Sequence, residues 1–371
     1  MLKLHILNVN HGDSIVVELI SENNQRAYGV IDSNRISNNP PPALSKLQSL
    51  GATQLNFIAL THPDADHYRG MLDIFNYYQD NISTFYTFPI GTHINGRLKK
   101  LGEIYKNILS SSDSSILKSD TEEFIRILSR AKEYVGLDNW EEPSGFFNVI
   151  NPPGFEDVEI ATVLPPPSIK GSVFELIEKG SWDVLKPQKT NPLSLVFYIK
   201  YKGIALVLCG DADRSSWIAR EQRCVAHGGK KLNATATKLP HHGSKRDCSQ
   251  EVINHIYLDS NKRFGFISAN GRSHPALEAL TTLKDNNIEP YCTNLSKFCG
   301  KIIKDLSPLP NVAPDLARFI RMMQIPSDKT YQPCQGDISI SINNHGSITI
   351  ERQYNHPCAF RGDFDQFFEE N

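Results

Sequence analysis

The chain has 371 residues, of which 40% are apolar and 22% are charged, and its formal net charge at pH 7 is −2. This composition is typical of a folded globular protein and excludes a disordered, collagenous or coiled-coil chain. The near-neutral charge also excludes a broadly basic coat for nucleic acid, although it does not exclude a local basic patch.

Neither a membrane span nor a disulfide framework is expected. The longest clean apolar run, 204–209, has six residues, whereas a spanning helix needs about 20. The first residues lack the long apolar stretch and the cleavage site of a signal peptide. The seven cysteines are scattered and form no C-x-x-C pair, which fits a reducing cytosol and argues against a cysteine-based zinc site. We therefore expect a cytoplasmic protein without a membrane partner.

The first part of the chain predicts a sheet with helices beside it. Apolar and β-branched residues indicate strands at 1–8, 14–20, 27–31 and 57–61. Helical spacing of apolar residues indicates helices at 43–50 and 68–78. The turn 10–13 separates the first two strands.

Residues 80–155 are expected to form a helical insertion. The spacing predicts helices at 98–109 and 122–135, and the Ser/Asp-rich stretch 110–120 between them is expected to be mobile. We expect the fold to tolerate removal of this insertion. One interpretation is that the basic side chains of the insertion help to bind a long substrate. The simpler interpretation is a pair of solvated helices without such a role. The chain then divides into four parts: the first half of a domain at 1–79, the insertion at 80–155, the second half of the domain at 156–304, and a C-terminal linker, hairpin and tail at 305–371.

The second half of the domain predicts another sheet. Two strands at 193–199 and 204–208 are followed by alternating helices and strands at 213–226, 234–239, 249–257, 264–268 and 275–285. Near the end, 337–342 and 347–350 flank a turn that is typical of a hairpin. Because β-rich segments precede alternating helices and strands in both halves, we expect an α/β protein with two sheets and helices outside them.

The string from His62 to His67 carries the strongest chemical signal. His62, Asp64, Asp66 and His67 directly follow an apolar strand. Imidazole nitrogens and carboxylate oxygens bind divalent ions at about 2.0–2.2 Å, and a strand-to-helix turn can direct several of them at one point. The spacing gives two His/Asp pairs, which suits two adjacent ions. The competing interpretation is an acidic loop that caps the next helix.

Three further strand ends carry similar residues. Asp211 follows the apolar strand 204–208, where a carboxylate could bridge two ions, whereas Asp213 is better placed to cap the next helix. His241 and His242 follow the strand 234–239, and His274 follows the strand 264–268. A single such histidine is usually an ordinary surface residue. Four strand ends that present His or Asp at one edge of a sheet indicate a functional site.

Taken together, these strings resemble the metallo-β-lactamase superfamily. They are Asn10-His11-Gly12-Asp13-Ser14, His62-Pro63-Asp64-Ala65-Asp66-His67, Gly210-Asp211-Ala212, His241-His242-Gly243-Ser244 and Ser273-His274-Pro275. Most closely they resemble the soluble metallohydrolase domain of competence DNA-uptake channel proteins. The resemblance runs from residue 1 to about residue 300, apart from the insertion at 80–155, and the hairpin at 337–350 resembles the end of that domain. It implies a four-layer αββα sandwich with a binuclear metal site between the sheets.

The resemblance also implies a role for each site residue. His62 and Asp64 would hold one ion, Asp66 and His67 the other, and Asp211 would bridge them. His274 fits the last ligand position of the superfamily. One of His241 and His242 would face the ions or the leaving group, and the sequence does not say which. Asp66, His241 and His242 are thus the candidate catalytic residues.

Three departures from the superfamily matter. Asp64 stands where relatives usually carry His, and residues 190–195 lack the histidine found between the first motif and the bridging Asp. Carboxylates in place of imidazoles make the ligand set harder, so Mn²⁺ or Mg²⁺ would compete better with Zn²⁺. His11 stands where the competence branch usually has Gln, which makes it either an extra polar contact or an ordinary turn residue.

The expected function is metal-dependent hydrolysis, with a phosphodiesterase or nuclease favoured. Two divalent ions would be balanced by three aspartates and a bridging hydroxide, and bound water ionises near neutral pH. Candidate substrate contacts near the third and fourth motifs are Lys238, Ser244, Lys245, Arg246 and Arg272. The partner would then be nucleic acid or another phosphodiester, and a protein partner is a further expectation. Hydrolysis of another ester, such as a lactone or thioester, and a non-catalytic interaction module remain the alternatives.

Overall fold

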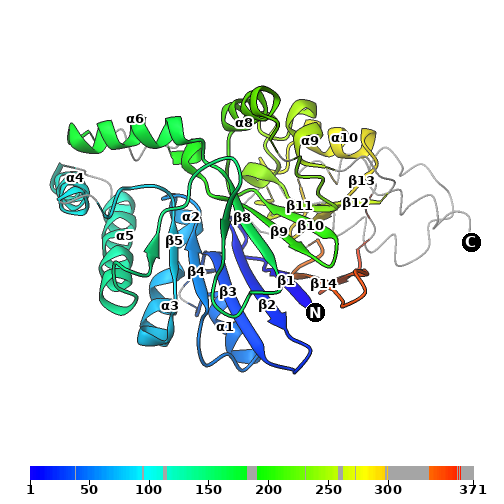
Figure 1. The fold of residues 1–371 in the computed structure, drawn as a ribbon, viewed down its shortest axis with the longest axis horizontal. Coiled ribbons are helices and arrows are strands. Elements are labelled where there is room, and N and C mark those ends of the chain that lie inside the picture. Colours follow the sequence, from blue (N-terminus) through cyan, green and yellow to red (C-terminus); the bar gives the residue numbers. More distant parts are fainter. Residues whose placement is uncertain are drawn as a thin grey trace, which may run out of the picture.

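Two β-sheets lie face to face in the computed structural model (Figure 1). The first sheet contains both the first strand, β1, and the last strand, β15. The structure describes residues 1–37, 39–93, 96–111, 115–181, 190–229, 231–257, 262–271, 273–296, 299, 334–356, 358 and 360. In the first sheet, β1, β2, β3, β14 and β15 pair antiparallel, and β3 to β6 pair in parallel. Its strands, in the order β15-β14-β1-β2-β3-β4-β5-β6, are β1 (Leu2–Ile6), β2 (Ser14–Ile20), β3 (Arg26–Ser33), β4 (Phe57–Leu60), β5 (Phe85–Thr87), β6 (Trp140–Glu141), β14 (Ile338–Ile342) and β15 (Ile348–Arg352).

The second sheet is antiparallel at one end and parallel at the other. Strands β7 to β10 pair antiparallel, and β10 to β13 pair in parallel. Its strands, in the order β13-β12-β11-β10-β9-β8-β7, are β7 (Asn148–Ile150), β8 (Glu159–Leu164), β9 (Val196–Tyr201), β10 (Ile204–Leu208), β11 (Ala236–Lys238), β12 (Arg263–Ile267) and β13 (Ile288–Cys292). Parallel strands therefore end at the same edge in each sheet, which is where loops can assemble a site.

Helices cover the outer face of each sheet. Those beside the first sheet are α1 (Pro42–Ser49), α2 (Ala65–Tyr68), α3 (Met71–Tyr78), α4 (Arg97–Ser111), α5 (Ser115–Tyr134) and α6 (Pro167–Glu178). Those beside the second sheet are α8 (Arg214–His227), α9 (Gln250–Ile256) and α10 (Leu277–Asp285). Short 3-10 turns are η1 (Gln79–Asn81), η3 (Asn191–Leu193) and η4 (Pro240–Gly243). None of the helices in the described part of the chain has both the length and the apolar character needed to cross a bilayer.

Three apolar layers hold the sandwich together. The middle layer packs Leu4 and Ile6 of the first sheet with Phe197 and Ile199 of the second. One outer layer joins the first sheet to its helices, and the other joins the second sheet to α8, α9 and α10. Because both faces of each sheet are covered, strands such as β2 are apolar on both sides rather than alternating. The expected α/β class and the four-layer αββα sandwich are confirmed.

The segment 80–155, expected to be a helical insertion, contains short strands as well as helices. The two predicted helices are present as α4 and α5, but the segment also adds β5 and β6 to the first sheet and β7 to the second. Helix α4 runs to Ser111 and α5 begins at Ser115, so most of the stretch 110–120 is helical. Strands of two or three residues are too short for a recognisable alternation, which explains why the sequence pattern missed them.

Helix α5 also binds the loop that carries the His/Asp string. Arg69, which lies two residues after His67, donates to both carboxylate oxygens of Asp120 on α5, at 2.9 and 2.8 Å. The Tyr68 ring packs against Phe124 of the same helix, with ring centroids 5.2 Å apart. The segment is therefore part of the core, and we no longer expect the fold to tolerate its removal.

The C-terminal hairpin forms as predicted. Its strand β14 pairs with β1, with Leu2 opposite Ile342, so residues far apart in the sequence complete one sheet. Most of the remaining C-terminal part that was expected at 305–371 lies outside the described residues.

Replacing Trp140 tests whether the segment 80–155 belongs to the core. Trp140 is fully buried in β6, packs on Phe85 and donates from its indole nitrogen to Thr87 Oγ1 at 2.9 Å. We expect Trp140→Ala to lower the free energy of unfolding by about 3–5 kcal/mol, because it leaves a large cavity. Val149, half exposed in β7 of the same segment, is the control, and Val149→Ala should cost less than about 1 kcal/mol. Equal small losses in urea unfolding of both variants would contradict this assignment.

Candidate metal centre

The loops after β4, β10 and β11 meet at one edge of the sandwich. The loop after β4 carries His62 and Asp64 and leads into α2, which carries Asp66 and His67. Asp211 follows β10, and the turn η4 after β11 carries two histidines. The edge thus joins four ligand-type residues from the first sheet to three from the second. This is the convergence that the strand-end pattern predicted.

An unusual backbone turns the η4 histidines toward the site. His241 and His242 both have left-handed backbone angles, with φ of 46° and 53°, and Gly243 follows with φ of 78°. Such angles cost about 1–2 kcal/mol for each non-glycine residue, and strain of this kind clusters at functional sites. The amide of His241 donates to Gly210 O at 3.0 Å, which holds the turn beside the residue that precedes Asp211.

Asp211 lies at the centre of the cluster. Its Oδ1 is 3.4 Å from Nε2 of both His67 and His242. Its Oδ2 faces the other side, 4.0 Å from His62 Nε2 and 3.8 Å from His241 Nε2. Each oxygen therefore faces a separate pair of imidazoles, as a carboxylate that bridges two ions would.

The two other aspartates of the string lie on opposite sides of Asp211. Asp64 Oδ2 is 3.6 Å from His62 Nε2, on the side that Oδ2 of Asp211 faces. Asp66 Oδ2 lies on the side that Oδ1 of Asp211 faces, 3.4 Å from His242 Nε2 and 3.9 Å from His67 Nε2. Groups of side chains that could share one ion include His62, His67 and Asp211, and His11, Asp66 and His242; Asp13 takes part in two further groups. His67 lies near both Asp66 and Asp211, so the expected pairing of Asp66 with His67 stays a prediction.

The residues fit divalent cations by two independent measures. Among the described residues, Nε2 of His62, His67 and His242 and Oδ1 of Asp211 are buried without a hydrogen-bond partner. Each such atom costs about 1–3 kcal/mol if nothing binds it. The recurring separation of 3.4 Å also matches the distance of about 3.4 Å between two ligands that share a tetrahedral ion at about 2.1 Å. Unpaired ligand atoms at that spacing are what bound ions require.

Carboxylates behind the imidazoles orient two of the rings. Asp32 Oδ2 is 2.7 Å from Nδ1 of His67, and Asp247 Oδ2 is 2.7 Å from Nδ1 of His241. A carboxylate on Nδ1 fixes the ring and directs Nε2 at the site. Neither Asp32 nor Asp247 was singled out in the sequence. The available signals were an acid at the end of β3 and an acid shortly after the His-His-Gly-Ser string.

A hydroxyl performs the same task for His62. Thr61 Oγ1 donates to Asp32 Oδ2 at 2.6 Å, so at 3.0 Å it must accept from the Nδ1–H of His62. His62 Nε2 then carries the lone pair and faces Asp64 and Asp211, as a metal ligand must. Asp32 accepts from the Thr61 amide as well, at 2.8 Å. One buried carboxylate thereby orients both histidines of the string.

The site is strongly anionic in its electrostatics. Burial opposes a charge on His67, but three nearby carboxylates, Asp211 foremost, raise its pKa well above the usual 6.5. Burial likewise opposes charge on Asp66 and Asp211, yet the neighbouring imidazoles lower the pKa of each carboxyl well below its usual value. The carboxylates are thus ionised at neutral pH and suited to bind cations.

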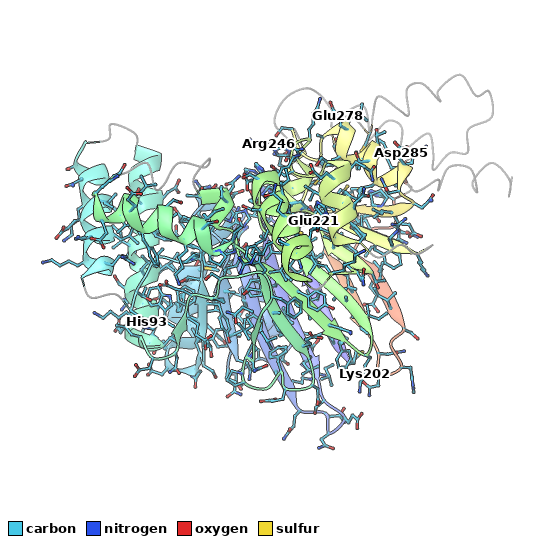
Figure 2. All side chains as sticks on the ribbon, turned by 45° about the horizontal axis from the view of Figure 1, so that its top comes forward. His93, Lys202, Glu221, Arg246, Glu278 and Asp285 are labelled. Carbon is cyan, nitrogen blue, oxygen red and sulfur yellow. The ribbon has the colours of Figure 1, made fainter. Side chains whose placement is uncertain are left out.

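The candidate substrate contacts fall in different places. Lys238 is fully buried and ion-paired with Asp13, so it does not face the mouth of the site, and its expected contact with a phosphate is wrong. Lys245 is exposed but pairs with Glu278 at 2.7 Å, and Ser244 Oγ donates to Asp247 at 2.7 Å. Arg246 is exposed on the same side of the molecule as Glu278 (Figure 2). Arg272 lies outside the described residues.

His274 and His11 are the two remaining candidate histidines of the site. His274 packs its ring against those of His241 and His242, at centroid distances of 5.4 and 6.4 Å. Burial, with the neighbouring imidazoles, lowers its pKa to about 4, so it is neutral. It belongs to neither group named above that could share an ion. Nε2 of His11, in contrast, is 3.4 Å from Asp66 Oδ2.

Asp213 caps α8 as predicted, accepting from the Ser216 amide at 3.0 Å.

Comparison with known proteins finds similarity to solved structures at low sequence identity. No family model matches the chain, and no curated protein matches it. Among solved structures, it is similar to CmlA, a diiron β-hydroxylase from Streptomyces venezuelae, at 9% identity and a TM-score of 0.37 over 75% of this chain and 45% of that chain. It is also similar to Zn²⁺-bound PqqB from Methylobacterium extorquens, at 10% identity and a TM-score of 0.39 over 75% and 84% of the respective chains. The chain thus spans about half the length of CmlA.

Removing the carboxylate that orients the string tests whether it supports metal binding. Asp32 has a left-handed φ of 55°, which Asn tolerates well, so Asp32→Asn should keep the backbone. We expect the affinity for Zn²⁺ or Mn²⁺ to fall about 10–100-fold, because two imidazoles lose their support. The exposed Asp80 in η1 gives the control variant Asp80→Asn, which should bind like the wild type. Unchanged affinity of Asp32→Asn in calorimetric titration would contradict this role.

Metal binding should also depend on pH in a defined direction. Because the pKa of His67 is raised, its ring holds a proton near neutral pH in the metal-free protein, and that proton must leave before Nε2 can bind an ion. We therefore expect metal affinity to rise with pH above the ordinary imidazole pKa of 6.5, with proton release on binding. Calorimetric titrations in two buffers of different ionisation enthalpy measure that release. An affinity independent of pH, with no proton released, would contradict this expectation.

Proposed function

We propose that the chain is a metal-dependent hydrolase that holds two divalent ions and acts on phosphodiesters. The observation that carries the proposal is Asp211, whose two oxygens each face a different pair of imidazoles. With Asp64 and Asp66 it provides three negative charges, which balance most of the charge of two divalent ions. Such ions, when bound, lower the pKa of water to about 7 and polarise an ester oxygen.

Burial suggests different tasks for the two adjacent histidines of η4. His242 is 1% exposed, with its Nε2 facing Asp66 and Asp211, which suits an ion ligand. The His241 side chain is 31% exposed and held by Asp247. Burial opposes its charge, but the hydrogen bond to Asp247 and the charge of Asp211 raise its pKa. We infer that His241 holds a proton at the mouth, where it can pass it to a leaving group.

The metal preference follows from the ligand atoms. Three carboxylates with imidazoles form a harder set than a histidine-rich site, so we infer that Mn²⁺, and to a lesser degree Mg²⁺, competes with Zn²⁺.

The substrate class is inferred from charge. The ions would attract a phosphodiester, in nucleic acid or in another form, and Arg246 is exposed nearby in the same loop as Lys245. Because Lys238 and Lys245 are engaged with Asp13 and Glu278, the described residues supply little further positive charge. That observation favours a second candidate, hydrolysis of an uncharged ester such as a lactone or thioester. A protein partner and a cytoplasmic location remain part of the proposal.

The unpaired imidazoles disfavour a non-catalytic interaction module. A surface that only binds protein has no need to keep three buried Nε2 atoms without partners at the cost described above.

An Asp211 variant tests the proposal. Chelator-treated full-length chain, reloaded with Mn²⁺, Zn²⁺ or Mg²⁺, is assayed on bis(p-nitrophenyl) phosphate, single-stranded DNA and p-nitrophenyl acetate. We expect diester hydrolysis in the wild type, and a loss on the order of 100-fold or more in Asp211→Asn, because the bridge is removed. Asp213→Asn is the matched control and should stay active, because Asn caps a helix as well as Asp does.

Two results would contradict the proposal. Hydrolysis of the acetate ester without hydrolysis of either diester would show that the substrate is an uncharged ester and not a phosphodiester. A wild-type chain that binds fewer than two ions, measured by elemental analysis after dialysis, would overturn the binuclear centre.

A further inference from the structure

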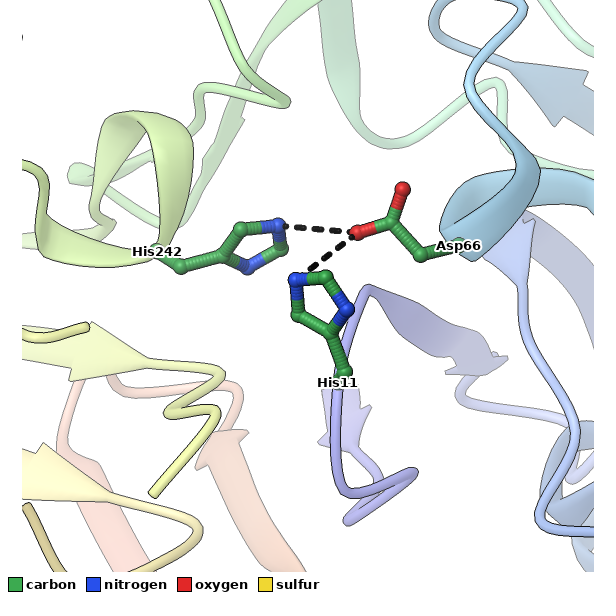
Figure 3. Close-up of side chains that lie close together, drawn as sticks. All are labelled: His11, Asp66 and His242. Atoms are coloured by element: carbon green, nitrogen blue, oxygen red, sulfur yellow. Dashed lines mark ion pairs between the residues drawn. The ribbon is translucent and has the colours of Figure 1, made fainter. Parts of the chain in front are cut away.

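His11 joins the cluster from the turn between β1 and β2, which also carries Asp13. Its Nε2 is 3.4 Å from Asp66 Oδ2, and the same oxygen is 3.4 Å from His242 Nε2 (Figure 3). The ligand atoms of these three residues all lie within 4.8 Å of one another. We propose that His11 is a ligand of the ion that Asp66 and His242 hold, an inference that rests on the proposed metal centre.

The distances distinguish this contact from a hydrogen bond. Elsewhere in the site, a carboxylate that hydrogen-bonds an imidazole lies 2.7 Å from it, as Asp32 does from His67 and Asp247 from His241. Three imidazoles approach Asp66 Oδ2, those of His11 and His242 at 3.4 Å and that of His67 at 3.9 Å, all beyond the normal range of about 2.7–3.2 Å. That separation leaves room for an ion at about 2.1 Å from each atom.

The turn that carries His11 is fixed to the backbone of Asp66. The amide of Asp13 donates to Asp66 O at 3.2 Å. Gly12 lies so close that a Cβ built on it would be 1.9 Å from the same oxygen, and its φ of 93° also requires glycine. Asn34 Nδ2 donates to His11 O on the other side of the turn. His11 therefore keeps its place relative to Asp66 through backbone contacts.

Two imidazoles and one carboxylate form a recognised ligand set for first-row transition metals. Here they come from the β1–β2 turn, α2 and η4, so the set ties the first sheet to the second. The His11 side chain is 47% exposed, which places it at the solvent side of the ion. The group on the other side, His62, His67 and Asp211, likewise joins two imidazoles and one carboxylate.

Titration with Co²⁺ alone tests the role of His11. Chelator-treated full-length wild type, His11→Gln and His345→Gln are titrated by calorimetry and by visible absorption, which depends on the ligands of bound Co²⁺. We expect two ions to bind the wild type. In His11→Gln we expect one ion to lose at least about tenfold in affinity, since even groups behind a ligand contribute 10–100-fold, with a changed absorption spectrum. His345, exposed in the β14–β15 turn, is the control and should leave both unchanged.

Each other outcome is decisive. Unchanged Co²⁺ affinity and absorption in His11→Gln would overturn the ligand role. His11 would then be either a substrate contact or an ordinary turn residue. Equal weakening of both ions with a lower melting temperature of the metal-free chain would assign His11 a structural role instead. A wild type that binds fewer than two ions would overturn the proposed centre itself. If two ions bind and no diester is hydrolysed, the proposed substrate fails, while the Co²⁺ measurements still decide the role of His11.

Discussion

A buried ion pair between Asp13 and Lys238 joins the two halves of the site. Both side chains are at most 1% exposed, one in the β1–β2 turn of the first sheet and the other at the end of β11 in the second. The Lys238 ammonium also donates to Gly210 O at 3.3 Å, next to the central Asp211. Removing one partner of a buried pair costs about 3–5 kcal/mol, because the other charge stays buried alone. The pair therefore holds the two sheet edges in register.

Negative charge is concentrated around this pair. Six carboxylates, those of Asp13, Asp32, Asp64, Asp66, Asp211 and Asp247, surround the imidazoles, and the buried Lys238 ammonium pairs with one of them, Asp13. Like charges at such distances repel strongly in a buried site. Protonated imidazoles relieve part of that repulsion in the metal-free chain, which is why the pKa of His67 is raised. Divalent ions would relieve it more completely and would satisfy the unpaired nitrogens.

The covered sheets explain why this cluster forms at an edge. Apolar layers fill both faces of each sheet, so the loops at the strand ends are where polar side chains can gather without displacing the core. Buried partners such as Asp32, Thr61 and Asp247 then fix the rings. A site built in this way is rigid behind the imidazoles and open at the rim, where His11 and His241 are partly exposed.

The sequence patterns alone indicated an α/β protein with two sheets and helices outside them, the order of the longer strands and helices, and the gathering of His62, Asp66, Asp211 and His242 at one edge. These features depend on local patterns: apolar strands of four or more residues, and ligand-type residues directly after them. The cap formed by Asp213 was predictable for the same reason.

Only the tertiary structure decided which way each polar group faces. His242 is buried whereas its neighbour His241 is partly exposed. Lys238, which was predicted to contact substrate, is buried and pairs with Asp13. The short strands β5 and β6 have no periodicity of their own, and they form only by pairing in the sheet, β5 with β4 and β6 with β5. Pairings between residues distant in the chain, such as that of Asp32 with His67, leave no spacing signal. Their energies arise from burial and contact, which the folded chain alone defines.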